Sequence, residues 1–140
     1  MKKLTAAAAK KLMKDLETAM DKGQARFLIN TQSKLSASSP IQSGRLASSW
    51  NIGHNSMDTS VPPERKKGER YVEIKEYSGK ITFDGDWHLS SNLPYAQRAA
   101  LDPGYIGSRG GGSGDWYTRI ENNLPRDAKR AFDEFLNKVK

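Results

Sequence analysis

Residues 4–35 of the chain, LTAAAAKKLMKDLETAMDKGQARFLINTQSKL, predict one long helix. Apolar side chains recur at steps of three and four residues, which places them on one helical face: Leu4, Ala8, Leu12, Leu16, Phe27. Acidic and basic side chains interleave on the polar face, as in an exposed helix with local ion pairs. Gly23 marks a bend or simply costs about 1 kcal/mol relative to alanine. Pro40 ends the helix, because the residue before a proline is driven out of the helical region.

Short strands are predicted downstream of this helix. Residues 50–52, 71–75, 81–83 and 87–89 have strand-like patterns, and Asp84-Gly85 is a strong hairpin signal. A short helix capped by Asn92 is expected at residues 93–101, and a C-terminal helix at residues 124–139 with Pro125 in its first turn. The expected fold class is α+β: a small antiparallel sheet of about four strands, packed by the long N-terminal helix and the C-terminal helix.

Two loops and a set of large aromatic side chains complete this outline. Residues 53–70 lack periodicity and carry a basic tip, while residues 103–115 are rich in glycine, so both are expected to be flexible and to become ordered on docking. The basic tip consists of Arg65, Lys66, Lys67 and Arg70. Six large aromatic side chains are expected in the core rather than on a base-stacking platform, which would need exposed rings beside basic residues: Trp50, Trp87, Trp116, Phe83, Phe132 and Phe135. Tyr95, Tyr105 and Tyr117 are candidates for an interface, since tyrosine tolerates a half-wet contact.

Length and composition limit the classes of function. A chain of 140 residues fits one domain, here residues 1–140. The absence of cysteine excludes a disulfide scaffold, a Cys-ligated zinc site and thiol catalysis, and two histidines do not favour a metal site, so no cofactor or metal is expected. No apolar run approaches the ~20 residues of a spanning helix, and the charged start is a poor signal peptide. The default compartment is a cytoplasm, or an assembly built there.

The net charge of +7 is unevenly distributed. Residues 1–70 hold 13 basic and 6 acidic residues, whereas residues 71–140 hold 10 of each. A basic half of this kind faces nucleic acid, an acidic partner or simply solvent.

Candidates for enzymatic chemistry are weak. Asp84 and Asp86 flank a glycine at an expected hairpin tip, which favours a turn over a metal site. His88 has no nucleophile signature near it and is expected to point away from the core. The glycine-rich residues 107–114 lack the lysine of a phosphate-binding loop. The chain is therefore expected not to be an enzyme, although a small hydrolase remains a minor alternative.

Two segments resemble the signatures of a known family. Residues 39–50, SPIQSGRLASSW, resemble the (S/T)PVDTGRLRxSW signature of tailed-bacteriophage neck and tail-completion proteins, a minor tail-component family that joins heads to tails. Residues 92–98, NLPYAQR, resemble that family's second signature, NNLPYAxx(L/V)ExG. The order of predicted elements also matches. The chain departs from the family at Gln42, where the family usually has Asp, and at residues 100–102, which replace Glu-x-Gly.

The resemblance implies a structural virion protein at the head–tail junction, assembled in the host cytoplasm. It implies a ring of identical copies, expected to be a hexamer, between the portal and adaptor proteins and the tail tube or terminator proteins. Ser43 is expected to cap a short helix, and Arg45 to make a bidentate contact with a carboxylate or backbone group. The expected assembly residues are Ser43, Gly44, Arg45, Asn92, Pro94, Tyr95 and Tyr105. The basic tip then faces an acidic partner or packaged DNA, and a stand-alone nucleic-acid-binding module is the alternative function.

Overall fold

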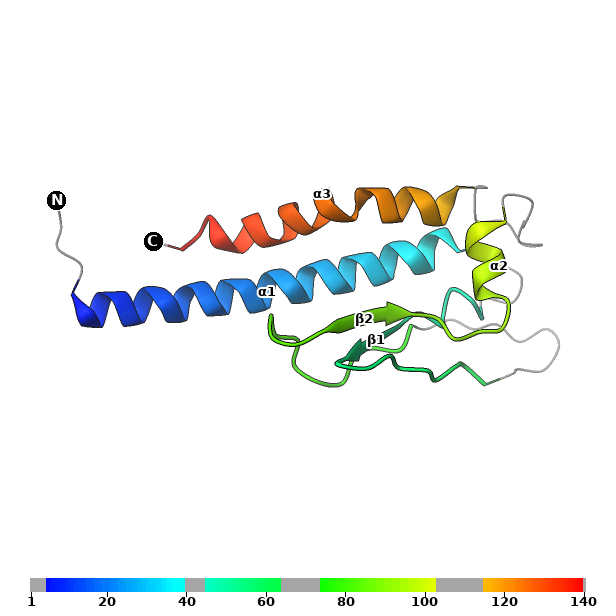
Figure 1. Cartoon of the computed structure of the whole chain (residues 1–140), viewed down its shortest axis with the longest axis horizontal. Helices are drawn as coiled ribbons and strands as arrows, with labels where there is room; N and C mark the ends of the chain where they lie inside the picture. The colour runs from blue at the N-terminus through cyan, green and yellow to red at the C-terminus, as the bar shows by residue number, and fades with distance from the viewer. Residues whose placement is uncertain (1–4, 40–44, 64–73, 103–114, 140) are drawn as a thin grey trace.

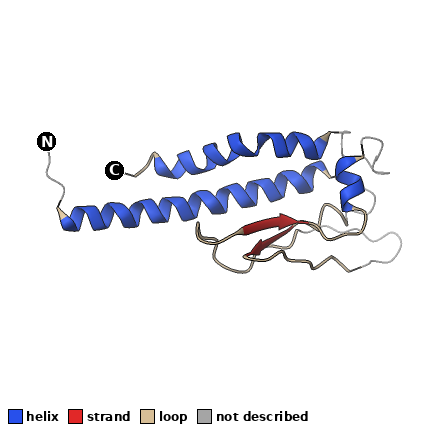
Figure 2. Ribbon diagram, in the orientation of Figure 1, coloured by secondary structure: helices blue, strands red, loops and turns tan. Residues whose placement is uncertain are grey.

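Two antiparallel helices and a two-stranded sheet form the structure, a computed structural model that describes residues 5–39, 45–63, 74–102 and 115–139. The elements follow the order α1 (Ala6–Ser38), β1 (Asn51–His54), β2 (Trp87–Ser90), α2 (Ala96–Leu101) and α3 (Trp116–Leu136). Figure 1 shows α3 lying along one side of α1 and the sheet along another, with α2 at the end where α1 finishes and α3 begins. Figure 2 shows that helix dominates the fold.

The long helix α1 confirms the prediction for residues 4–35 and extends it by one turn. At its start, the Thr5 hydroxyl accepts a hydrogen bond from the backbone N–H of Ala8 at 3.0 Å, which satisfies one of the free donors of the first turn. At its end, Ser39 adopts an extended conformation and its hydroxyl donates to the carbonyl of Leu35. Serines 36 and 38 therefore remain helical, and the chain turns only directly before Pro40.

Gly23 is a point of close approach between helices. A β-carbon at this position would meet the ring of Phe132 on α3 and would lie 3.0 Å from the Phe132 Cα. Ala19 and Ala131 are also buried, so small residues from both helices line the crossing. Ion pairs from Arg26 to Glu134 (3.2 Å) and from Lys34 to Asp127 (2.6 Å) join the same two helices. The glycine therefore has a packing role that the sequence did not reveal.

The C-terminal helix α3 begins eight residues earlier than predicted, at Trp116 rather than at residue 124. Trp116 is buried and its indole N–H donates to the carbonyl of Ala99 on α2 at 3.0 Å. Pro125 accordingly lies inside the helix rather than in its first turn. A proline there removes the N–H that would bond to the Glu121 carbonyl. The helix nevertheless continues through it, with Trp116 buried and Tyr117 and Ile120 packed against the core.

The prediction of about four strands is wrong for the part of the chain that the structure describes, which contains one antiparallel pair, β1 and β2. Residues 81–83 do not join the sheet. The backbone N–H of Phe83 donates instead to the Asp21 carboxylate on α1 at 2.8 Å, and the Phe83 ring packs edge-on against Phe132. Likewise the carbonyl of Lys75 accepts a hydrogen bond from Gln32 of α1 at 3.2 Å. Side chains of α1 thus form hydrogen bonds with backbone groups that would otherwise be available to pair in a wider sheet. Residues 71–73 of the predicted strand 71–75 lie outside the described residues.

The Asp84-Gly85 turn serves the β1–β2 pair rather than a hairpin with residues 81–83. Gly85 has a φ of +81°, a conformation that glycine adopts readily. Beyond the turn, the Asn55 N–H donates to the Asp86 carbonyl at 2.6 Å, and the Asp86 N–H donates to the Asn55 side chain at 3.0 Å. These bonds continue the pairing in which Ile52 lies opposite Leu89 and Gly53 opposite His88.

The core lies where α1, the sheet, α2 and the start of α3 meet. Its buried members are Leu35, Leu46, Trp50, Leu93, Ala96, Ala99, Ala100 and Trp116. The expected burial of Trp50 and Trp116 is confirmed, whereas Phe83, expected in the core, is 48% exposed. The core thus gathers both segments that carry the family resemblance.

Candidate assembly surface

The first resemblance segment places Arg45 against a backbone carbonyl. Its Nε and Nη2 atoms both donate to the carbonyl oxygen of Pro62, at 3.1 and 3.0 Å. The sequence predicts a bidentate contact of Arg45 with a carboxylate or a backbone group, and the two donors here share one backbone oxygen. Residues 45–48 form a hydrogen-bonded turn rather than the expected short helix, with the Ser49 N–H bonded to the Leu46 carbonyl at 3.0 Å. Ser43 and Gly44 lie outside the described residues.

In the second resemblance segment, Asn92 does not cap the short helix as expected. The helix α2 starts at Ala96, with Tyr95 as the residue before it and no side-chain cap, so the prediction that Asn92 caps this helix is wrong. Asn92 donates instead to the carbonyl of Thr59 at 3.2 Å. Tyr95 is half-buried and packs against the core, while Pro94 is exposed.

These contacts converge on residues 58–62, which we call the clamped segment. Arg45 bonds to the carbonyl of Pro62, Asn92 to that of Thr59, and the buried Asn51 of β1 to that of Ser60 at 2.6 Å. Three side chains from separate parts of the chain therefore fix one short stretch of backbone. Part of the loop expected to be flexible is thus held in place, and residues 53 and 54 belong to β1.

The clamped segment begins at a strongly stabilised carboxylate, Asp58. Its oxygens accept hydrogen bonds from the ammonium of Lys75 at 2.7 Å and from the hydroxyl of Ser60 at 2.6 Å. The side-chain hydrogen bond from Lys75, followed by the side-chain and backbone hydrogen bonds of Ser60, lowers the pKa of Asp58 from 3.8 to about 2. The charged form of Asp58 is therefore the one that the folded protein favours.

Replacing Asp58 with asparagine is expected to make acid stability less dependent on pH. Because the folded pKa is depressed, the carboxylate stabilises the fold above pH 3.8, and this stabilisation is lost as the pH falls through about 2. Solvent screening limits the effect to about 1 kcal/mol. Urea unfolding of wild type and Asp58→Asn between pH 7 and pH 2 measures it. Two curves separated by the same free energy at both extremes would contradict this role for Asp58.

Replacing Arg45 with alanine is expected to free the clamped segment without unfolding the protein. Hydrogen bonds from a charged donor contribute roughly 1.5–3 kcal/mol, so exchange of the amides of residues 58–61 should accelerate about tenfold or more, Pro62 having no amide hydrogen. The exchange rate of Arg45→Lys should lie between those of wild type and Arg45→Ala, since an ammonium lacks the planar pair of donors of a guanidinium. Hydrogen exchange followed by mass spectrometry measures this, with α3 as the internal reference. Unchanged exchange in residues 58–62 of Arg45→Ala would show that the segment is held by other contacts.

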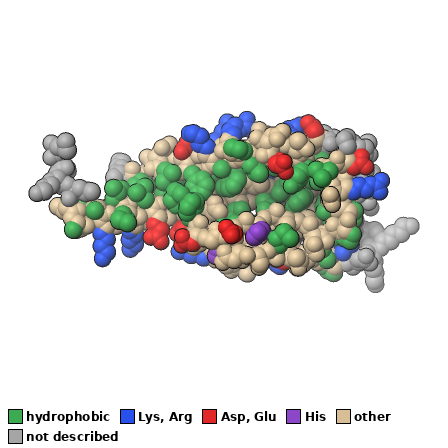
Figure 3. Space-filling view, in the orientation of Figure 1, with side chains coloured by type: hydrophobic (Ala, Val, Ile, Leu, Met, Phe, Trp, Pro, Cys, Tyr) green, Lys and Arg blue, Asp and Glu red, His purple; other side chains and the backbone are tan. Residues whose placement is uncertain are grey.

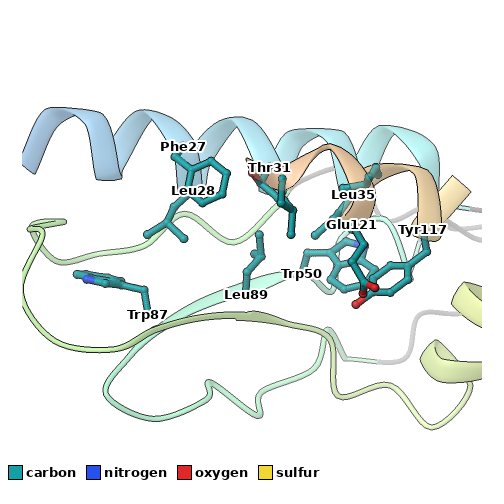
Figure 4. Close-up of a pocket in the computed structure, with 11 residues that line it drawn as sticks. Phe27, Leu28, Thr31, Leu35, Trp50, Trp87, Leu89, Tyr117 and Glu121 are labelled. Atoms are coloured by element: carbon teal, nitrogen blue, oxygen red, sulfur yellow. The ribbon is translucent and has the colours of Figure 1, made fainter. Parts of the chain in front are cut away.

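An apolar cleft, which the sequence did not reveal, opens between α1, β2 and α3. It has a volume of about 220 Å³. Figure 4 shows Leu28 and Leu35 pointing from α1 toward Leu89 of β2, with Glu121 beside Trp50 and Tyr117. The complete lining is Phe27, Leu28, Thr31, Leu35, Trp50, Trp87, Leu89, Tyr117, Ile120, Glu121 and Leu124. The strand pattern of residues 87–89, which places Trp87 and Leu89 on one face, and the choice of Tyr117 as an interface residue are the signals that could have indicated it.

Aromatic stacking shapes both ends of the cleft. At one end the rings of Trp50 and Tyr117 stack with centroids 6.5 Å apart. Burial raises the pKa of Tyr117, and the negative charge of Glu121 raises it further. At the other end His54 stacks on Trp87 with centroids 4.1 Å apart, while its Nε2 lies 2.9 Å from the carbonyl oxygen of Asp84. The cleft therefore has a stacked aromatic pair at each end.

The remaining predicted site residues are not brought together by the described structure. Tyr105 and the basic tip, residues Arg65, Lys66, Lys67 and Arg70, lie outside the described residues. Within the described ranges, no three histidine or acidic side chains gather into a group suited to a metal ion. None of the described helices is long and apolar enough to span a bilayer.

Comparisons with known proteins add no further assignment. No family model, curated protein or solved structure matches this chain. The resemblance to head–tail joining proteins therefore rests on residues 39–50 and 92–98 and on the order of the elements.

Proposed function

We propose that this chain is a structural virion protein of a tailed phage that forms a ring at the head–tail junction. In this role it joins the portal and adaptor proteins to the tail tube or terminator proteins. It works by offering surfaces to its neighbours rather than by catalysis. The proposal rests on the two resemblance segments and on what their residues do in the structure.

The observation that carries the proposal is the convergence of the two resemblance segments. Leu46 and Trp50 from the first, and Leu93 and Ala96 from the second, are buried in one core cluster. Arg45 and Asn92 then hold the clamped segment from two sides. Residues that match the family signatures thus hold the backbone of the clamped segment in place. This suits a structural protein, which acts by presenting a surface of defined shape to its neighbours.

The candidate catalytic residues are used for structure as well. The carbonyl of Asp84 accepts the Trp87 indole N–H at 3.1 Å, and both backbone groups of Asp86 bond to Asn55. His88 pairs with Gly53 across the sheet. These contacts are made by backbone groups and describe a well-fixed turn, which is the role that the sequence predicts for residues 84–86.

A nucleic-acid-binding module is the second candidate, and one observation favours it. Lys10, Lys11, Lys14 and Lys22 are exposed along the first half of α1. Such a module predicts an affinity for DNA that falls steeply as salt rises. Titrating duplex DNA at two salt concentrations separates it from a joining protein that meets DNA only inside the assembled channel.

In vitro complementation tests the proposed function. A phage that encodes this chain, grown with a stop codon early in the gene, supplies an extract, to which the purified protein is added. We expect the added protein to restore infectious particles. An extract that stays non-infectious after addition of folded protein, or one that is infectious without it, would overturn the proposal.

A further inference from the structure

The first turns of α1 run alongside the end of α3 and then past it, and we call residues 6–16 the overhang. A groove lies between α1 and the end of α3. It is lined by Lys11, Asp15 and Ala19 of α1, by Phe135 of α3, and by Val139, which follows α3. The residues of α1 before Lys11 therefore extend past the end of α3. Figure 1 shows this end of α1 standing clear of the other elements. Met13 is 71% exposed there and Leu16 is 40% exposed. The overhang is thus a helix end with apolar side chains in solvent.

The apolar face of the overhang continues the face of α1 that lines the cleft. Met13, Met20 and Phe27 are spaced seven residues apart and so lie on one side of the helix, and Phe27 is part of the cleft lining. Figure 3 shows hydrophobic side chains gathered in a band along the length of the face in view. A contiguous apolar band on a folded chain usually marks a contact with another molecule.

The overhang is basic. Lys10, Lys11 and Lys14 are exposed, and no acidic side chain precedes Asp15 in the described part of α1. The free N–H groups at the start of the helix add partial positive charge. Two overhangs placed side by side would therefore repel each other.

The cleft has acidic side chains at two places on its border. Glu121 belongs to its lining, and Asp84 and Asp86 are exposed next to Trp87, while Lys75 and Lys80 are the basic side chains earlier in the same described segment, and Lys75 is paired with Asp58. The basic side chains Arg26, Lys34 and Arg130 line the neighbouring groove together with Asp127 and Glu134. The cleft's volume of about 220 Å³ is below the roughly 300–1,000 Å³ usual for small-molecule sites. The cleft thus suits a few apolar side chains flanked by lysines rather than an organic ligand.

We propose that the overhang of one copy docks into the cleft of a second copy, with Met13 and Leu16 entering between α1, β2 and α3. The contact joins two different surfaces of the same chain, since charge disfavours overhang with overhang and cleft with cleft. Repeated head-to-tail contacts of this type close into a ring or grow as a filament. The inference deepens the proposed function, on which it rests, by naming the contact that builds the ring.

Cross-linking tests this contact sharply, because the chain has no cysteine of its own. One preparation carries Met13→Cys in the overhang and the other carries Leu124→Cys in the cleft. Mixed and treated with a short bismaleimide cross-linker, they should give a band at twice the 15.6 kDa mass of the chain, containing one copy of each variant. A double variant with both cysteines should give a ladder of higher multimers.

A matched control uses Ser33→Cys, which is exposed on α1 seven residues from Arg26, away from the cleft. We expect the mixture of Met13→Cys with Ser33→Cys to give little heterodimer, and Lys14→Glu added to Met13→Cys to reduce its cross-linking to Leu124→Cys. Equal cross-linking to Ser33→Cys and Leu124→Cys, or none to either, would overturn the contact.

The outcomes for the contact and for the proposed function separate cleanly. Complementation by a chain that shows no overhang-to-cleft cross-link would reject the contact and leave head–tail joining intact. Efficient cross-linking by a chain that fails to complement would leave the contact standing as a self-association surface and reject the joining role.

Discussion

Truncating Trp50 to alanine is expected to lower the free energy of unfolding by about 3–5 kcal/mol. Trp50 is buried, its ring stacks on Tyr117 and meets Trp116 edge-on, and its indole N–H donates to the Ser39 hydroxyl at 2.9 Å. The substitution removes all three interactions and leaves a cavity. Small domains are stable by only about 5–15 kcal/mol, so the variant should unfold at a much lower denaturant concentration.

Urea unfolding followed by circular dichroism measures this loss. Met57→Ala, at an exposed position, is the matched control and should change stability by less than about 0.5 kcal/mol. Trp50→Phe keeps part of the stacking but leaves the Ser39 hydroxyl without its donor, so its loss should lie between the two. A Trp50→Ala variant as stable as Met57→Ala would mean that the core does not depend on this residue.

Replacing Gly23 with alanine is expected to destabilise the protein by about 1–3 kcal/mol. This runs against helix propensity, since alanine is favoured over glycine by about 1 kcal/mol inside a helix. The added β-carbon would meet the Phe132 ring and would lie 3.0 Å from the Phe132 Cα, so α1 and α3 would have to move apart. Thermal unfolding of wild type and Gly23→Ala measures the net effect.

A double-mutant cycle identifies the cause of that loss. In a Phe132→Ala background the ring is gone and only the backbone contact remains, so the cost of Gly23→Ala should become smaller. Ser33→Ala, exposed on the same helix, should be neutral or slightly stabilising. A stabilising effect of Gly23→Ala in the wild-type background would contradict the close approach of α1 and α3 at this position.

Local patterns predicted the helices better than the sheet. The apolar spacing of residues 4–35 is long and regular, and α1 follows it closely. The strands failed because segments such as residues 81–83 find partners through tertiary contacts: the Phe83 N–H bonds to Asp21, sixty-two residues away in sequence. The start of α3 was missed for the same reason, since the turns before Pro125 are held by tertiary contacts of Trp116, Tyr117 and Ile120 with the core.

The candidate site was predictable in its residue types but not in its partners. Arg45 was expected to bond to a backbone or carboxylate group, and it bonds to the carbonyl of Pro62. Which carbonyl it meets depends on the path of the loop, which no local pattern encodes. The apolar cleft depends on α1, β2 and α3 together, so its walls became visible only once these elements were packed.

Electron microscopy of phage lysates tests the central proposal most directly. The phage carries a stop codon early in the gene for this chain, and the control lysate comes from a host that suppresses it. We expect separate heads and tails in the first lysate, with heads that are DNA-filled or leaking DNA, and joined particles in the second. Intact, infectious particles made without the chain would contradict a role in joining heads to tails.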